Sequence, residues 1–467
     1  MKGSNTGNHF LRLGNILLDL RQLSNAENSL LMALQYYYKD ACNGPKVFDY
    51  FGFQIPLSPP CSQALVTDLS KLSPGDRLNL LQHPTTGLLN CIESIAKLYQ
   101  EMYEGSLGTE YYKLANEYHN KYQCMFEQLY GDDSLVPAAA HGYFVLGKAC
   151  HNRDHYEEAQ AFYSRSLRLF GQIYGEGRDR PSLALLHREM GRNYIMLDMN
   201  TTAKQHLCLA LDMYKRLYGK ASNRQIDMLD VHSIMADCLC ELNENSKALE
   251  HYMLEYNMQK CFHGEDSDHP DLVVGLNNIG FTYLRMKEFT KAKEPLMLAL
   301  NMDRRIHGEH GDGDHTGISS VILHNLGNYY RNMKQYTKAE EHYKLSIDMY
   351  RRIRLGEDDL DIARVLNRLG HNYNEMKDYK KAEEHFWLSI EMYRRLLGVD
   401  SDHPDIADLL CCIGKTQVAL RSLEKAGMNF KESLEMYTRL HDDNSQHPDL
   451  LEVKQCVEKY CQLSDLP

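Results

Sequence analysis

The stretch DIARVLNRLGHNYNEMKDYKKAEEHFWLSIEMYRRLLG, residues 361–398, decides the fold of this chain. In its first half, apolar side chains recur at three- and four-residue steps, the period of an amphipathic helix: Val365, Leu366, Leu369 and Tyr373. Lys377 and Asp378 interrupt this pattern, and a second apolar stripe begins at Ala382. The stretch therefore predicts two helices, A and B, joined by a tight turn.

The same pattern returns about every 44 residues, which predicts stacked helical hairpins instead of one globular core. A small residue marks helix A of each repeat: Gly147, Gly191, Ala236, Gly280, Gly327, Gly370 and Gly414. An alanine follows twelve residues after each marker: Ala159, Ala203, Ala248, Ala292, Ala339, Ala382 and Ala426. We expect these positions where helices A and B cross, because a larger side chain would hold the two backbones apart.

The ends of the predicted helices also carry signals. Basic pairs such as Arg394–Arg395 lie in the last turn of helix B, where positive charge complements the helix dipole. The glycine that follows, such as Gly398, is expected to end the helix in the left-handed conformation. Histidines precede a proline at the start of several A helices, and we expect His269, His403 and His447 to act in caps or turns rather than in catalysis.

The bulk composition restricts the classes of function. The net charge of −12 disfavours partners such as nucleic acid or an anionic membrane, which require a basic surface. The chain has no apolar run of about 18 residues and no apolar signal core at its start, so we expect no membrane insertion. The 13 cysteines are scattered singly, as expected for buried, reduced thiols of a cytoplasmic protein.

These repeats resemble the tetratricopeptide repeat. Six residues of one repeat match the family pattern: Leu369, Gly370, Tyr373, Ala382, Phe386 and Ser389. The family's usual period is 34 residues, and this chain adds roughly ten. The longer period, the DHPD opener and the LNN and KAKEPL runs resemble the kinesin light chain and nephrocystin-3 branch. The resemblance implies an all-α, right-handed α-solenoid of helix-turn-helix repeats with a C-terminal capping helix.

The register of the repeat suggests five segments. We predict an N-terminal repeat unit at 8–39, a Pro-rich irregular insert at 40–86, a degenerate unit at 87–131, a seven-unit array at 137–440 and a capping helix at 447–463. The insert could pack on the array or act as a disordered binding or regulatory segment, and both interpretations stay open. A kinesin light chain has an N-terminal heptad coiled coil, whereas this chain opens on a repeat unit, so the resemblance implies the repeat domain alone.

No catalytic or metal-binding motif emerges from the sequence. The chain contains no GxSxG, no phosphate-binding GxxxxGK[ST] and no HExxH. The segment GEHGDGDH, residues 308–315, lacks the spacing of a calcium loop, and we expect a flexible connection there. We therefore expect no enzyme, no cofactor and no metal.

The resemblance places helix A of each repeat on a concave, peptide-binding face. The side chains at its exposed positions are rich in Asn, Arg and His: Arg188, Arg192, Asn277, Asn278, Arg285, His324, Asn325, Asn328, Arg331, Asn332, Arg364, Asn367, Arg368 and His371. Asparagine both donates and accepts, which suits an extended peptide backbone, and arginine provides charge-assisted bonds to acidic groups.

The family's clamp for chaperone tails is matched only by Asn325, Arg364 and Arg368, because Asn277 and Phe281 depart from its pattern. We therefore expect a scaffold or adaptor that binds another acidic peptide segment of unknown identity, extended or helical, centred on residues 226–398. The alternative is a self-associating or autoinhibited solenoid whose groove is occupied by its own 40–86 insert.

Overall fold

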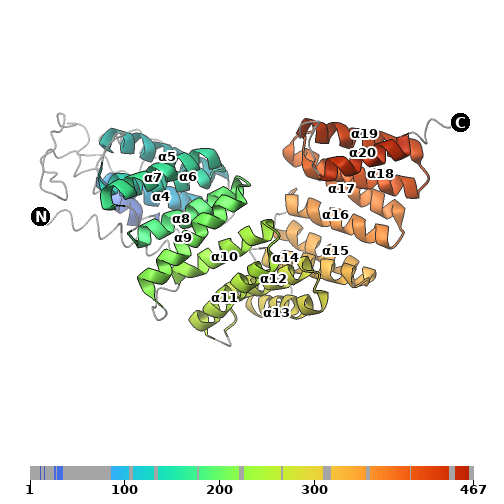
Figure 1. Cartoon of the computed structure of the whole chain (residues 1–467), viewed down its shortest axis with the longest axis horizontal. Coiled ribbons are helices and arrows are strands. Elements are labelled where there is room, and N and C mark those ends of the chain that lie inside the picture. The colour runs from blue at the N-terminus through green and yellow to red at the C-terminus, as the bar shows by residue number, and fades with distance from the viewer. Residues whose placement is uncertain are drawn as a thin grey trace, which may run out of the picture. The chain divides into compact units, whose positions relative to one another are not determined.

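The computed structural model describes residues 86–104, 109–130, 135–175, 178–219, 226–264, 267–308, 317–353, 358–399, 401–440 and 448–461, together with residues 11, 15, 26, 27 and 29–34. Every regular element in this part of the chain is an α-helix (Figure 1). No helix in these ranges is long and apolar enough to cross a membrane. The predicted insert at 40–86, except Thr86, lies outside the described residues, as do residues 309–316 and His447.

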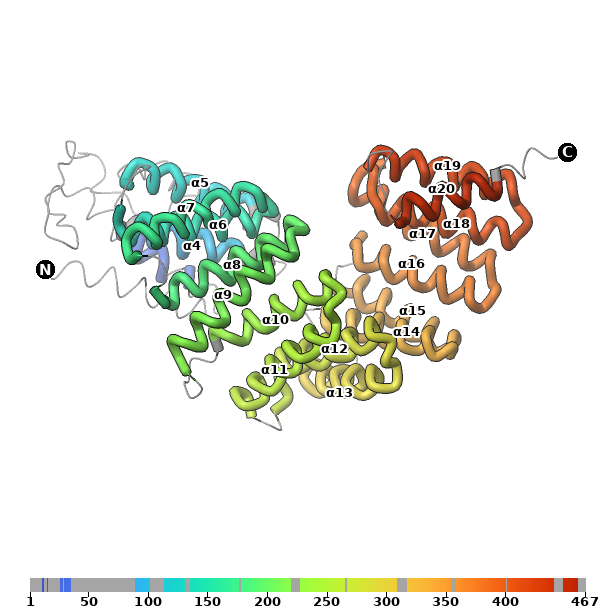
Figure 2. Tube along the Cα trace, in the orientation of Figure 1, coloured from blue at the N-terminus to red at the C-terminus, as the bar shows by residue number. Residues whose placement is uncertain are grey.

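The chain divides into two compact blocks, an N-terminal block (Met1–Ser222) and a C-terminal block (Asn223–Pro467). From residue 86 on, the described part of the N-terminal block contains the helices α4 (Thr86–Glu104), α5 (Thr109–Tyr130), α6 (Pro137–His151), α7 (Tyr156–Tyr174), α8 (Pro181–Met196) and α9 (Asn200–Tyr218). Consecutive helices pair as antiparallel hairpins, α4 with α5, α6 with α7 and α8 with α9 (Figure 2). The division falls inside the predicted array at 137–440, and the repeat pattern gave no sign of it.

The C-terminal block continues the same alternation of helices A and B. Its helices are α10 (Ile226–Glu241), α11 (Asn245–His263), α12 (Pro270–Arg285), α13 (Phe289–His307), α14 (Ile318–Asn332), α15 (Tyr336–Ile353), α16 (Leu360–Glu375), α17 (Tyr379–Leu397), α18 (Pro404–Ala419), α19 (Leu423–Leu440) and α20 (Pro448–Cys461). Each helix B also packs on helix A of the next hairpin, so the hairpins form one continuous stack within the block. The predicted all-α stack of hairpins is therefore confirmed.

The crossing of helices A and B depends on the marker glycine. A Cβ atom added to Gly370 would lie 2.6 Å from the ring of Phe386, which is fully buried on the facing helix. The other marker glycines meet their partner side chains at 2.5 to 2.6 Å in the same way: Gly147 with Tyr163, Gly191 with Leu207, Gly280 with Leu296, Gly327 with Tyr343 and Gly414 with Phe430. The prediction that small residues mark the crossing is confirmed, and the obstacle is a large side chain, not only the opposite backbone.

The turn from helix A to helix B has the same geometry in all seven hairpins from α6 to α19. One non-glycine residue takes a left-handed backbone: Asp154, Asp198, Asn243, Lys287, Lys334, Lys377 and Arg421. At Lys377, φ is +61°, and the amide of Asp378 donates to the carbonyl of Tyr373 over 2.9 Å, which closes a Schellman motif. The side chain of Asp378 then caps α17 by accepting from the amide of Lys381.

The glycine after helix B behaves differently from the sequence prediction. Gly398 has φ of +103° but ψ of 146°, and Gly264 has φ of +101° and ψ of 145°. This is the extended positive-φ region that is essentially restricted to glycine, not the left-handed helical region. The predicted left-handed C-cap is therefore wrong in ψ, while the requirement for glycine is correct.

A salt bridge closes the open end of several hairpins. Arg439 at the end of α19 donates to both carboxylate oxygens of Asp402, which precedes α18, over 2.8 Å each. The same bidentate pair with the same separation of 37 residues recurs three times: Arg216 with Asp179, Arg305 with Asp268 and Arg395 with Asp358. The hydrogen bonds from Arg439 lower the pKa of Asp402. The helix dipole therefore does not account alone for arginines such as Arg395 in the last turn of helix B, because each has an aspartate partner before helix A.

The predicted roles at helix starts and at the end of the array are confirmed. The Nδ1 atoms of His269 and His403 accept the amide hydrogens of Asp271 and Asp405, each over 3.2 Å, and so cap α12 and α18. At the end of the array, α20 packs on α19 and buries its Leu450 and Val453. Because α20 covers the stacking surface of the last hairpin, it serves as the predicted capping helix.

Two sequence expectations are resolved only in part. Ala26, Leu30 and Ala33 are fully buried in the same core as α4 and α5, while the division into units at 8–39 and 87–131 stays a prediction. Five described cysteines are buried as expected, but Cys124, Cys208 and Cys261 are exposed.

Gly370→Ala should lower the stability of the chain by about 1–3 kcal/mol, because the new methyl group must displace the ring of Phe386. Urea denaturation followed by circular dichroism measures the effect. Gly171→Ala in α7 is the matched control, since a Cβ at Gly171 meets nothing within 4 Å and alanine favours a helix. Equal effects of the two substitutions would contradict the role assigned to the crossing.

Lys377→Gly should raise the stability by about 0.5–1 kcal/mol, because glycine adopts the left-handed backbone of this turn without the steric cost of a side chain. The same change at Lys380, in the first turns of α17, should lower the stability by about 1 kcal/mol. Thermal denaturation of both variants compares the two signs. A loss of stability in Lys377→Gly would show that the lysine side chain itself stabilises the turn.

Candidate functional site

The A helices of the C-terminal block form one face. Helix α12 packs directly against α14, and α14 packs against α16, in addition to the contact that each makes with its own helix B. The predicted groove residues are divided between the blocks, with Arg188 and Arg192 on α8 and the other twelve on α12, α14 and α16.

In the N-terminal block, the two predicted arginines hold a buried carboxylate. Arg188 donates to Glu189 through Nε at 3.0 Å and through a terminal nitrogen at 2.6 Å, and Arg192 lies 3.8 Å from the other oxygen. Burial alone would raise the pKa of Glu189, but the two arginines outweigh it and lower the pKa below its usual value. The two arginines thus stabilise the buried carboxylate of Glu189. The side chain of Arg188 is itself largely buried.

Three of the predicted groove residues in the C-terminal block are engaged within the stack. The amide of Asn325 on α14 donates to Asn277 on α12 over 2.9 Å, and both side chains are buried. Arg285 donates to the carbonyl of Cys240 over 2.6 Å and to Asn243 over 3.2 Å, and so covers the end of α10 in the preceding hairpin. Their polar groups join neighbouring hairpins, which the periodicity of one helix could not reveal.

Other predicted asparagines bond within their own hairpin. Asn328 accepts from the hydroxyl of Tyr343 over 2.8 Å, and Asn332 donates to the carbonyl of Asn328 over 2.8 Å. Asn278 accepts a weak bond from Asn277 over 3.4 Å. These residues lie at the positions predicted for the face, but their internal bonds make them supporting residues of the site.

The remaining predicted residues come together on α14 and α16. We name this group the basic cluster, which consists of His324, Arg331, Arg364, Asn367, Arg368 and His371. Arg364 pairs with Asp361 over 3.0 Å at the surface. In the described part of the chain, no carboxylate lies within ion-pair distance of Arg331 or Arg368. Three polar atoms of the cluster are buried without a hydrogen-bond partner: His324 Nε2, Arg331 Nε and Asn367 Oδ1.

The two histidines of the basic cluster are held in the neutral form. Burial, followed by the positive charges of Arg368, Arg331 and Arg364, lowers the pKa of His324 to about 4. Burial and the charges of Arg331, Arg368 and Lys415 lower the pKa of His371 to about 4 as well. The net positive charge of the cluster therefore comes from its arginines, while the imidazoles offer neutral donors and acceptors between them.

Lys415 extends the positive charge onto α18. Its ammonium group donates to Glu452 on the capping helix over 2.7 Å. It occupies the same helical position as His371 one hairpin earlier, 44 residues before it. The repeat register predicts Lys415 on the same face as His371. It is not one of the candidate groove residues predicted from the sequence.

Two family models match the sequence of these hairpins. One tetratricopeptide repeat model matches residues 319–395, which include the basic cluster, and another matches residues 140–172 in the N-terminal block. The hairpins that these models match are tetratricopeptide repeats. No curated protein matches its sequence at a significant level.

The chain is also similar in fold to solved structures. The apo form of the quorum sensor NprR from B. thuringiensis has a TM-score of 0.56 and 11% identity, over 78% of this chain and 92% of NprR. BtubC (BKLC) from P. vanneervenii has a TM-score of 0.42 and 20% identity, over 52% and 92% of the two chains. A putative kinesin light chain repeat protein from Podosopora anserina has a TM-score of 0.38 and 15% identity, over 47% and 95%. At these identities the likeness shows the fold alone.

A group with the composition of a metal site lies at another junction of the tetratricopeptide array. Nitrogen or oxygen atoms of His263, His269 and Asp271 lie within 4.8 Å of one another. The two imidazole rings, however, are stacked with their centroids 3.5 Å apart and their planes within 16°, so their in-plane lone pairs do not converge on one ion. His269 Nδ1 also accepts the cap hydrogen bond of α12. The geometry is that of a helix cap, and we assign no metal to it.

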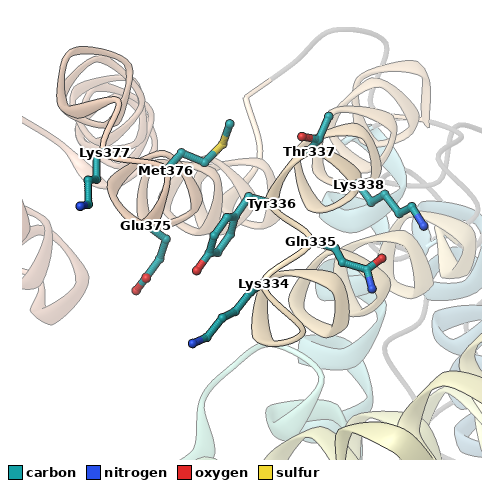
Figure 3. A pocket seen from close by; sticks show the side chains of 8 residues that line it. All are labelled: Lys334, Gln335, Tyr336, Thr337, Lys338, Glu375, Met376 and Lys377. Atoms are coloured by element: carbon teal, nitrogen blue, oxygen red, sulfur yellow. The ribbon is translucent and has the colours of Figure 1, made fainter.

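An open depression lies between two turns of the tetratricopeptide array (Figure 3). Residues 334–338 line it from the turn between α14 and α15, and Glu375, Met376 and Lys377 line it from the next turn. Two of the left-handed lysines, Lys334 and Lys377, are among the residues that line it. The depression follows from the stacking of two identical turns, and its lining has no buried titratable group.

Replacing both His324 and His371 by Gln should weaken the acid sensitivity of the tetratricopeptide array. Because the pKa of each histidine is about 4 in the folded state and ordinarily 6.5, the unfolded chain binds more protons between these values. The wild type therefore loses stability as the pH falls from 6.5 to 4, and the variant should lose less. Urea midpoints across this range measure the slope. His155→Gln, which removes an exposed imidazole just before α7, is the control for the substitution itself.

Proposed function

We propose that this protein is a cytoplasmic protein-interaction scaffold without enzymatic activity, and that it binds an acidic peptide segment in extended form on the A-helix face of its C-terminal block. The observation that carries the proposal is the basic cluster. Arg331 and Arg368 have no carboxylate partner within the described ranges, in a chain whose net charge is −12. A solenoid usually acts through its surface, and an uncompensated charge on that surface selects ligands of the opposite sign.

The unpartnered polar atoms support the same ligand. A buried donor or acceptor without a hydrogen bond costs about 1–3 kcal/mol. His324 Nε2, Arg331 Nε and Asn367 Oδ1 are three such atoms within one cluster. The backbone amides and carbonyls of an extended peptide, together with an acidic side chain, provide both donors and acceptors for them.

Hydrogen bonds within the stack support a smaller set of proposed contact residues. Asn277, Asn325 and Arg285 bond to neighbouring hairpins, so we place the ligand on α14, α16 and α18 instead of on the whole range 226–398. Asn328 and Asn332 lie on α14 beside the cluster and contribute by supporting it. The proposed ligand then has an acidic side chain near Arg331 and Arg368. Arg364, which pairs with Asp361 at the surface, lies beside them.

The triple variant Arg331→Glu, Arg364→Glu and Arg368→Glu should bind an acidic peptide at least about 30-fold more weakly, because charge-assisted hydrogen bonds contribute about 1.5–3 kcal/mol each when shielded. The probe is a fluorescein-labelled peptide of three Glu-Ser-Glu-Tyr repeats, measured by fluorescence anisotropy. The same peptide with Gln in place of Glu should bind the wild type weakly. Added salt should weaken binding of the acidic peptide.

A second triple variant is the control for the change in net charge. Arg304→Glu, Arg351→Glu and Lys431→Glu reverse three exposed charges of B helices and should leave the affinity unchanged. If both variants lose the same affinity for the acidic peptide, binding depends only on the net charge of the protein, and the proposal is refuted. Tighter binding in a chain that lacks residues 40–86 would show that this insert competes for the face, which was the alternative from the sequence.

A further inference from the structure

A row of exposed leucines runs along the B helices of the C-terminal block. Six residues after the repeat alanine, four consecutive hairpins carry leucine at the same helical position: Leu254, Leu298, Leu345 and Leu388. The exposed fractions of these residues are 49%, 49%, 48% and 41%. They lie on α11, α13, α15 and α17, whereas the basic cluster lies on A helices. We name this set the leucine row.

The leucine row has a defined end. In the next hairpin the same position is Glu432, which accepts a hydrogen bond from Arg394 over 2.9 Å. In the N-terminal block the position is Leu209 on α9, 45% exposed, and Arg165 on α7. A single exposed leucine needs no explanation, because much of any protein surface is apolar. Four exposed leucines at one helical position, ended by an ion pair, exceed this scatter of single residues and indicate an interaction surface.

Carboxylates flank the leucine row on both sides. One turn before the leucines, the four hairpins carry an exposed glutamate: Glu250, Glu294, Glu341 and Glu384. Three residues after Leu345 and Leu388 come Asp348 and Glu391, which are also exposed. None of these six carboxylates has an ion-pair partner among the described residues.

The nearby cations are occupied by other partners. Arg305 and Arg395, seven residues after the leucines of their helices, form the bidentate salt bridges with Asp268 and Asp358. At the start of the B helices, Lys247, Lys291 and Lys381 pair with the acids Glu244, Glu288 and Asp378, and the ammonium group of Lys338 lies over the ring of Tyr330. The uncompensated charge beside the leucine row is therefore negative.

We propose that the leucine row is a second binding surface, and that it docks a basic amphipathic helix of a partner protein. Apolar side chains of the partner pack on the leucines, and lysines or arginines on its flanks pair with the two rows of carboxylates. On a helix, residues seven apart are separated by about 10.5 Å. An apolar stripe of this period on the partner is proposed to contact the leucines, which recur at the equivalent position of each helix B.

Charge disfavours other occupants of the row. An acidic segment or a nucleic acid would be repelled by the same carboxylates. A second copy of the chain in parallel register would place equal rows of carboxylates against each other. The proposal is independent of the peptide site on the A helices, because the two surfaces share no residue and select ligands of opposite charge.

The test uses the full chain and a labelled helical peptide made of three copies of the heptad LKKALKA. Fluorescence anisotropy should show binding to the wild type, and at least tenfold weaker binding to the variant with Leu254→Gln, Leu298→Gln, Leu345→Gln and Leu388→Gln. The control variant Leu396→Gln, Leu397→Gln and Leu451→Gln removes exposed leucines outside the row and should bind like the wild type. All these side chains are at least one-third exposed, so circular dichroism and the urea midpoint should change little.

A charge exchange gives a second, independent measurement. The variant Glu294→Lys, Glu341→Lys and Glu384→Lys should lose affinity for LKKALKA and gain affinity for the matched peptide LEEALEA. The arginine triple variant of the basic cluster should bind LKKALKA like the wild type. Equal binding by the leucine variant, or no binding by the wild type, would overturn the proposal. So would light scattering that shows a wild-type dimer and a monomeric leucine variant, because the row would then join two copies of this chain.

Discussion

The contact between a glycine of helix A and a large side chain of helix B is the constraint on which the rest of the structure depends. At Gly370 the ring of Phe386 occupies the space of a missing Cβ, and this contact fixes how closely the two helices approach. With the crossing fixed, a single left-handed residue such as Lys377 is enough to reverse the chain between the helices. Each hairpin then presents the same two surfaces to its neighbours, so the stack follows from repetition.

Much of this could be predicted because the responsible contacts lie within one hairpin. The spacing from Gly370 to Ala382, the break at Lys377 and the cap at His403 are local, and the sequence shows them directly. The ψ angle of Gly398 was mispredicted because several backbone conformations share a positive φ, and residue type alone does not distinguish them. The ψ angle of Gly398 depends on the direction in which the chain must leave α17 to enter the next helix.

The functional residues were harder to predict because they depend on contacts between hairpins. Asn325 and Arg331 both follow from the same register of α14, yet Asn325 bonds to Asn277 in the preceding hairpin, whereas Arg331 has no acidic partner among the described residues. Helical periodicity gives the face of a residue, not its neighbours on other helices. The leucine row could have been found in the sequence, because each leucine follows the repeat alanine by six residues. The resemblance to the repeat family, however, implied a binding face on helix A only. The resulting division of chemistry, cationic on A helices and apolar and acidic on B helices, suits a protein that joins two different partners.

The bidentate salt bridges have a consequence for how such an array can vary in length. Arg439 and Asp402 belong to one hairpin, as do Arg305 and Asp268, so neither pair depends on an adjacent hairpin for its partner. A hairpin that is inserted, deleted or transplanted as a whole retains its own closing interaction, its own glycine contact and its own turn. The surfaces between hairpins must still match, both in their apolar side chains and in polar pairs such as Asn325 with Asn277. The number of hairpins is therefore adjustable without redesign of the unit, which makes this array a suitable source of modules for building binding proteins of chosen length.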